Sequence, residues 1–150
     1  MKPLYIFDLD GTLALTEHRQ HLVQCDKPNW TAFFAACVDD DPNEPVIDTL
    51  LRLLDSGADV WVWSGRSSEV MDQTKDWLAD QLGGYGHGVP LTMRFEGDYT
   101  PDEELKAAWL DSLPAYDRRR LVAVFDDRDK VVAMWRSKGI PCFQVAPGSF

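Results

Sequence analysis

Three short runs of the chain are apolar or aromatic at every position: Leu4–Phe7, Val60–Trp63 and Leu121–Phe125. A strand with one face in water alternates apolar and polar residues, so an unbroken run is typical of a strand buried on both faces. Such strands occur in parallel sheets that carry helices on both sides, and we therefore expect a parallel sheet at the centre of the molecule. Two weaker runs extend it: Leu91–Phe95 alternates and suits a sheet edge, and Cys142–Val145 is a final strand.

Helical patterns separate these strands. Apolar residues recur at helical spacing over Val46–Leu54, and Gly57 follows as a stop. A second apolar stripe runs over Val70–Leu78 and is opened by Ser67. The first of these helices is therefore predicted between the strands at residues 4–7 and 60–63, and the second between the strands at residues 60–63 and 91–95.

Two further helices have recognisable ends. Thr100 is expected to cap a third helix, with Pro101 at its first position and Glu103 three residues after the cap. A fourth helix is predicted over Arg128–Lys138, closed by Gly139.

Strands that alternate with helices predict right-handed crossovers and the α/β class, with a Rossmann-like parallel sheet flanked by helices. The length suits a single domain over residues 1–150. Residues 15–41 form a long connection after the first strand, and connections of that length are often functional lids. We therefore expect a small cap-like insertion there.

Charge and cysteine content exclude several function classes. The net charge is −10, from 15 basic and 25 acidic residues, which excludes a protein that coats duplex nucleic acid with a basic surface. A small pocket for one phosphate stays possible. The three cysteines (Cys25, Cys37 and Cys142) form no CxxC pair, so neither a disulfide framework nor a zinc site is expected. With no apolar run long enough for a signal peptide or a membrane span, a cytoplasmic location without membrane association is expected, and the oligomeric state is left open.

Polar residues follow three of the predicted strands. The first strand is followed by DLDGT (residues 8–12), the second by SGR (residues 64–66) and the fourth by DDR (residues 126–128), while Lys106 lies on the third predicted helix. Ligands bind at the carboxyl ends of strands in an open parallel sheet, so these groups are expected to meet at one edge. Carboxylates that close repel each other unless a cation neutralises them, and an all-oxygen set favours Mg²⁺.

Each motif by itself also has a purely structural interpretation. DLDGT and SGR are compatible with ordinary turns, the paired aspartates with a helix cap, and Lys106 with a solvated charge. Their joint placement at one edge is what favours a functional site.

Together these four motifs resemble the signature motifs of the haloacid dehalogenase (HAD) phosphohydrolase superfamily. The GDYT sequence at residues 97–100 with its Lys-containing helix, the segment 131–136 and the segment 142–150 resemble the 3′-phosphatase domain of bacteriophage polynucleotide kinase–phosphatases. The similarity covers most of the chain except the insertion at residues 15–41. It implies a HAD-type Rossmannoid fold and phosphatase activity.

The resemblance also implies catalytic and metal-binding roles. Asp8 is expected to be the nucleophile that forms an aspartyl-phosphate, and Asp10 to be the general acid and base. The carboxylates of Asp8 and Asp126 and the backbone carbonyl of Asp10 would surround Mg²⁺, with Asp127 as a ligand or a support.

Several residues are expected to hold the phosphate or the rest of the substrate. Ser64, the Gly65 amide and Lys106 would bind phosphoryl oxygens, Thr12 would orient the loop at the phosphate, and Arg66 is a further candidate clamp. Arg19 and Trp30, both in the insertion, are the weakest substrate candidates, with Trp30 as a base-stacking residue. The triplet at residues 118–120 is expected to be a solvated basic turn at the far edge of the sheet, and most other tryptophans to lie in the core.

Three functions are compatible with these residues. The leading one is an Mg²⁺-dependent phosphomonoester hydrolase that acts on nucleic-acid 3′-phosphate ends or on nucleotides. A 5′-nucleotidase would use the same phosphoryl chemistry. A receiver-type signalling module is the third, although its acid pair would follow the first strand rather than the fourth. The sequence holds no GxxxxGK[ST] phosphate loop, so a stand-alone phosphatase without kinase activity is expected.

Overall fold

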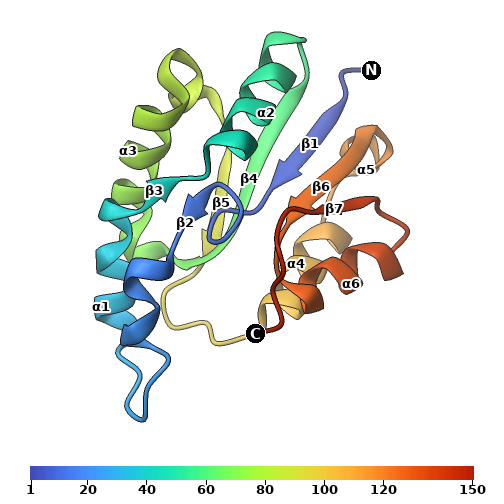
Figure 1. Cartoon of the computed structure of the whole chain (residues 1–150). Coiled ribbons are helices and arrows are strands. Elements are labelled where there is room, and N and C mark those ends of the chain that lie inside the picture. The colour runs from blue at the N-terminus through green and yellow to red at the C-terminus, as the bar shows by residue number, and fades with distance from the viewer.

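The computed structural model describes residues 1–150 and contains one central sheet of five parallel strands (Figure 1). Their order is β5-β4-β1-β6-β7. The strands are β1 (Leu4–Phe7), β4 (Asp59–Ser67), β5 (Leu91–Arg94), β6 (Leu121–Asp126) and β7 (Cys142–Gln144). The predicted α/β class is confirmed, and so is the edge position of β5.

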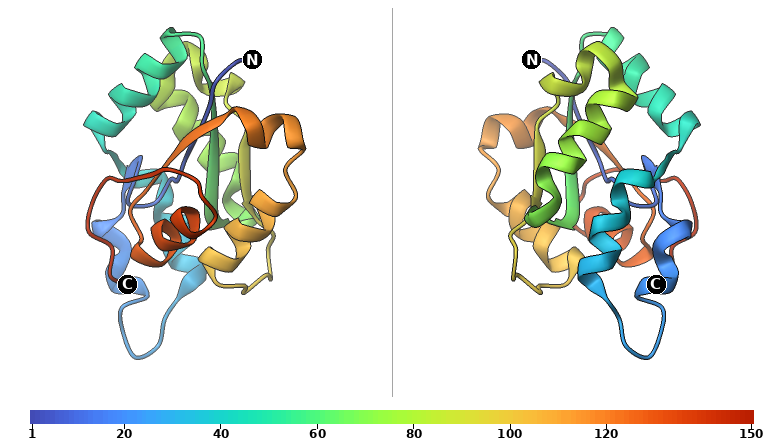
Figure 2. Two further views of the ribbon diagram at one scale, coloured as in Figure 1. Left: turned by 90° about the vertical axis from the view of Figure 1, so that its right-hand side faces the viewer. Right: turned by 90° about the vertical axis from the view of Figure 1, so that its left-hand side faces the viewer.

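Each central strand is buried on both faces, as the unbroken apolar runs predict. In β1, Leu4 and Ile6 enter one core while Phe7 enters the other. The side chains of β4 alternate in the same way: Trp63 packs in the core that contains Leu4 and Ile6, and Val62 packs in the core that contains Phe7. Helices α2 (Glu44–Asp55) and α3 (Met71–Leu82) cover one face, and α4 (Asp102–Asp111) and α6 (Asp129–Ser137) cover the other (Figure 2).

Two local predictions are wrong. Thr100 does not cap α4, because its hydroxyl donates to Asp98 over 2.7 Å and Pro101 occupies the cap position. The arginines at 118–120 do not form a turn but the last turn of a short helix, α5 (Ala115–Arg120). Arg120 folds back to donate to Asp117 and forms an ion pair with Asp59. As predicted, this triplet precedes β6 and so lies away from the carboxyl edge of the sheet.

The long connection after β1 folds into a compact insertion. Strands β2 (Ala14–Leu15) and β3 (Asp41–Pro42) pair antiparallel at its base. Between them lie the 3₁₀ helix η1 (Glu17–Leu22), the α-helix α1 (Trp30–Ala35) and the 3₁₀ helix η2 (Ala36–Asp39). Two further 3₁₀ helices, η3 (Ser68–Val70) and η4 (Gly83–Gly88), flank α3. The indole N–H of Trp77 in α3 donates to the carbonyl of Asp40 over 2.9 Å, which ties the end of the insertion to the main domain.

No helix of the protein combines the length and the apolar character that crossing a membrane requires.

Candidate active site

Asp8 lies directly after β1, the middle strand of the sheet, and its side chain is mostly buried. Lys106 on α4 donates to it over 2.8 Å and to Asp126, at the end of β6, over 3.0 Å. The Thr12 hydroxyl lies 3.3 Å from the second oxygen of Asp8 and 3.4 Å from Asp127. The structure therefore brings together residues of two motifs, DLDGT and DDR, with Lys106 of α4, as their position at the carboxyl edge predicts.

Three buried carboxylates meet here with one ammonium group. One oxygen each of Asp8, Asp126 and Asp127 lie within 4.8 Å of one another. Burial, followed by the charge of Asp126, raises the pKa of Asp8 well above its ordinary value and that of Asp127 to about 6. The pKa of Lys106 is also raised, because the charges of Asp126 and Asp8 outweigh its burial. Negative charge thus exceeds positive charge, and an all-oxygen cluster of this kind fits a hard cation such as Mg²⁺.

Two glycines are required by close approaches in this site. Gly11 has φ +79°, and a Cβ there would overlap the carboxylate of Asp127. A Cβ on Gly65 would lie 2.6 Å from Asp102 Oδ1. Next to Gly65, the buried Ser64 hydroxyl accepts the backbone N–H of Arg66 over 3.1 Å. The glycines therefore allow two acidic side chains to approach the backbone at residues 11 and 65.

Asp10 is held by two arginines. Arg19 donates to its carboxylate over 2.9 Å and Arg66 over 2.8 Å. Burial opposes the ionised form of Asp10, yet the charges of Arg66 and Arg19 keep its pKa below the ordinary value. Asp40, from the end of the insertion, accepts from both arginines over 2.7 and 2.8 Å. The carboxylate of Asp10 is still 29% exposed, so a substrate can reach it.

Arg19 and Arg66 are therefore not free to clamp a phosphate in this structure, because acidic side chains of the protein already pair with them. Both side chains are fully buried, and their guanidinium groups are engaged by Asp10 and Asp40. Trp30 is 54% exposed and packs its ring against Phe33 at 5.6 Å. Direct contact of these three predicted residues with substrate stays a prediction.

Sequence reasoning missed two acids at this site. Asp40 lies in the insertion, where no motif marks it, and Asp102 is one of several acids at the start of α4. Asp102 forms ion pairs with Arg94 and with Arg128. The only available signal for Asp102 was its position four residues before Lys106, which is one helical turn.

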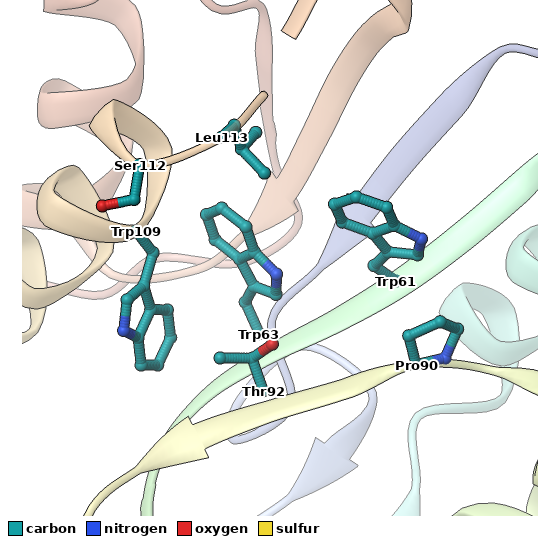
Figure 3. A pocket seen from close by; sticks show the side chains of 7 residues that line it. All are labelled: Trp61, Trp63, Pro90, Thr92, Trp109, Ser112 and Leu113. Atoms are coloured by element: carbon teal, nitrogen blue, oxygen red, sulfur yellow. The ribbon is translucent and has the colours of Figure 1, made fainter. Parts of the chain in front are cut away.

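A hollow lined by tryptophans lies elsewhere (Figure 3). Trp61 and Trp63 of β4 and Trp109 of α4 line this cavity of about 340 Å³. None of the acids described above contributes to it. Trp61 and Trp109 are only partly buried, whereas Trp63, Trp77 and Trp135 belong to the core as predicted.

The sequence over residues 2–150 matches the family model for the phosphatase domain of polynucleotide kinase PNKP. The chain belongs to this family. Among solved structures, a chain in the Pnkp1/Rnl/Hen1 complex is 31% identical to this PNKP-type phosphatase domain, with a TM-score of 0.78. The match covers 99% of this chain and 48% of that chain, so the domain spans about half of its relative.

More distant structures share the fold. A class C acid phosphatase from Bacillus anthracis, solved with tungstate bound, is 17% identical with a TM-score of 0.68, covering 99% of this chain and 67% of that chain. A haloacid dehalogenase-like hydrolase, SP0104 from Streptococcus pneumoniae, is 16% identical with a TM-score of 0.55, covering 95% and 84% of the two chains. The PNKP-type domain is thus a HAD-type phosphatase with the fold that the motifs predict.

Proposed function

We propose that this domain is an Mg²⁺-dependent phosphomonoester hydrolase that removes phosphate from nucleic-acid 3′ ends or from nucleotides through an aspartyl-phosphate. The arrangement of Asp8 carries the proposal: it lies at the end of the central strand, is held by Lys106 and Thr12, and faces Asp126 and Asp127. A carboxylate that is buried but oriented by two donors is suited to attack rather than to solvation.

The proposed reaction has two steps. An oxygen of Asp8 attacks phosphorus, the ester P–O bond breaks, and Asp10 donates a proton to the leaving alkoxide. Water then attacks the phosphorus of the aspartyl-phosphate, gives its proton to Asp10, and releases inorganic phosphate and free Asp8. Arg19 and Arg66 favour the ionised Asp10 that the second step needs. The charge of a bound phosphate acts in the opposite sense and favours the protonated form for the first step.

The residues present fit a magnesium ion. The carboxylates of Asp8, Asp126 and Asp127 would hold it together with the backbone carbonyl of Asp10. Lys106 is the one basic side chain that forms ion pairs in this cluster, so negative charge is left for the metal ion to neutralise. A bound Mg²⁺ would supply charge stabilisation to the phosphoryl oxygens. Lys106, the Ser64 hydroxyl and the Gly65 amide would bind the remaining phosphoryl oxygens. Thr12 would keep the loop at residues 8–12 in place.

The family and a relative support the substrate class. The family model describes the phosphatase domain of a polynucleotide kinase, and a 31% identical chain belongs to a Pnkp1/Rnl/Hen1 RNA repair complex. Both favour a phosphate at a nucleic-acid end over one on an unrelated metabolite.

A panel of four substrates tests the proposal: 3′- and 5′-phosphorylated oligonucleotides, and 3′- and 5′-mononucleotides. Phosphate release is measured with and without Mg²⁺. We expect the two 3′-phosphates to have the higher kcat/KM. Selective hydrolysis of the 5′-mononucleotide would instead favour a nucleotidase, and no release from any of the four would refute the proposal.

A further inference from the structure

Two aromatic side chains stand in solvent on the loop that follows β5. Phe95 is 80% exposed and Tyr99 is 91% exposed, more than any other large hydrophobic side chain of the protein. Neither ring has an aromatic partner within the chain, whereas the exposed Trp30 packs on its neighbours in α1. Large exposed apolar area is typical of an interaction site, and these two side chains expose the largest fractions in the protein.

The backbone of this loop is held in place by Arg94. Its guanidinium donates to the carbonyls of Asp98 and Thr100 over 3.0 and 2.6 Å and forms an ion pair with Asp102. Asp98 also accepts the backbone N–H and the hydroxyl of Thr100 over 2.9 and 2.7 Å. At the other end, the N–H of Glu96 donates to Ser68 over 2.9 Å. The two rings are therefore presented by an ordered backbone, which lowers the entropic cost of binding a ligand.

The same arginine connects the loop to the active site. Arg94 Nε donates to the carbonyl of Gly65 over 2.8 Å, and Gly65 follows Ser64 in the phosphate-binding motif. Standard backbone dimensions then limit the Cα of Tyr99 to about 14 Å from this carbonyl. The loop runs along the edge of the sheet at which β1 and β6 end (Figures 1 and 2). The side chain of Tyr99 and one nucleoside can together bridge a distance of this order.

We infer that Phe95 and Tyr99 form a subsite that stacks on the base of the nucleoside carrying the scissile phosphate; this inference rests on the proposed function. Aromatic rings bind every base through its π-face, which suits an enzyme that acts on ends of varied sequence. The acids of the loop, Glu96 and Asp98, repel phosphates, so the ligand of this subsite is the neutral base and not the sugar–phosphate backbone. Glu103 and Glu104 at the start of α4 add to this repulsion.

The test compares thymidine 3′-monophosphate with deoxyribose 3-phosphate, which lacks the base. Tyr99→Ala should lower kcat/KM for the nucleotide about 5- to 100-fold through KM, leave its kcat unchanged, and leave the base-free substrate unaffected. Tyr99→Phe should retain wild-type values because the ring remains. Phe95→Ala should resemble Tyr99→Ala. Tyr116→Ala is the matched control, because this tyrosine is 51% exposed on α5, away from the carboxyl edge.

A binding measurement separates the subsite from catalysis. In the Asp8→Asn background, the fluorescence of 2-aminopurine riboside 3′-monophosphate should be quenched on binding, and Tyr99→Ala should abolish the quenching. Equal effects of Tyr99→Ala on both substrates, or a selective loss in Trp30→Ala instead, would overturn the inference. Failure of the wild-type protein to hydrolyse either substrate would refute the proposed function itself, before any variant is compared.

Discussion

The ammonium nitrogen of Lys106 lies 2.8 Å from Oδ1 of Asp8, although the two residues are 98 positions apart in the chain. This contact joins α4 to the end of β1 and leaves the second oxygen of Asp8 beside Thr12. It neutralises one of three clustered acids and orients the carboxylate that we propose as the nucleophile. The first prediction concerns that carboxylate.

Asp8→Asn should reduce hydrolysis of an aryl phosphate to background, because the amide cannot form the aspartyl-phosphate. The fold should persist, since the change removes one of three mutually repelling carboxylates and no packing group. We expect a melting temperature in EDTA within about 4 °C of the wild type. Asp111→Asn is the control, because Asp111 is a 55% exposed carboxylate on the same helix as Lys106. Turnover by a well-folded Asp8→Asn protein would exclude covalent catalysis by Asp8.

Chelation with EDTA should abolish activity, and Mg²⁺ should restore it. Because the ion binds the folded state, Mg²⁺ at 100 times its dissociation constant should stabilise the protein by about 2.7 kcal/mol. Differential scanning fluorimetry should show this rise in the wild type and a smaller one in Asp126→Asn. If Mg²⁺ raised the melting temperature of Asp126→Asn as much as that of the wild type, the ion would bind elsewhere.

Asp10→Asn should slow hydrolysis of an alkyl phosphate by about 10²- to 10⁴-fold, because the alkoxide leaves without a proton. A nitrophenolate leaving group needs less protonation, so phosphoryl transfer from nitrophenyl phosphate should be affected less. Burst kinetics separate this step from hydrolysis of the intermediate. An equal loss in the transfer step for both substrates would remove Asp10 from the role of acid.

The stability contributed by Asp10 should depend on pH in a defined direction. Its pKa in the folded protein is lowered from the ordinary 3.8 by Arg66 and Arg19 against the effect of burial. The ionised form is thus favoured by folding, so its contribution is complete above pH 3.8 and is lost as the pH falls through the lower folded value. Urea unfolding in EDTA should show a difference between wild type and Asp10→Asn that is constant near neutrality and shrinks below pH 3.8. A difference that grows on acidification would contradict the lowered pKa.

Binding of a long 3′-phosphorylated strand should depend weakly on salt. The net charge is −10, and two of the arginines near the site, Arg19 and Arg66, are engaged by Asp10 and Asp40. Few cations remain to neutralise phosphates, so the log–log slope of affinity against salt should be about −1 to −2 on single strands. The measurement uses Asp8→Asn protein to prevent turnover. A slope steeper than about −4 would require an extended basic track.

The amino-acid sequence by itself determined the sheet and the edge at which the chemistry lies. Unbroken apolar runs such as Leu4–Phe7 suit strands buried between two layers of helices, and helical crossovers between neighbouring strands make the strands parallel. The residues at the ends of the strands must then share one edge, which is why Asp8 and Asp126 could be grouped without a structure. These inferences succeed because strand burial depends on the local apolar pattern and strand direction depends on the helical connections between strands.

Only the tertiary structure decided how the charges pair. Arg66 lies 56 residues from Asp10 and 26 from Asp40, and nothing in its local sequence distinguishes a buried bridge from a phosphate clamp. The approach of Asp102 to Gly65 and the exposure of Tyr99 are likewise set by how loops from different strands pack. The pairing of a charged side chain depends on the distances and burial around it, and these exist only once the chain has folded.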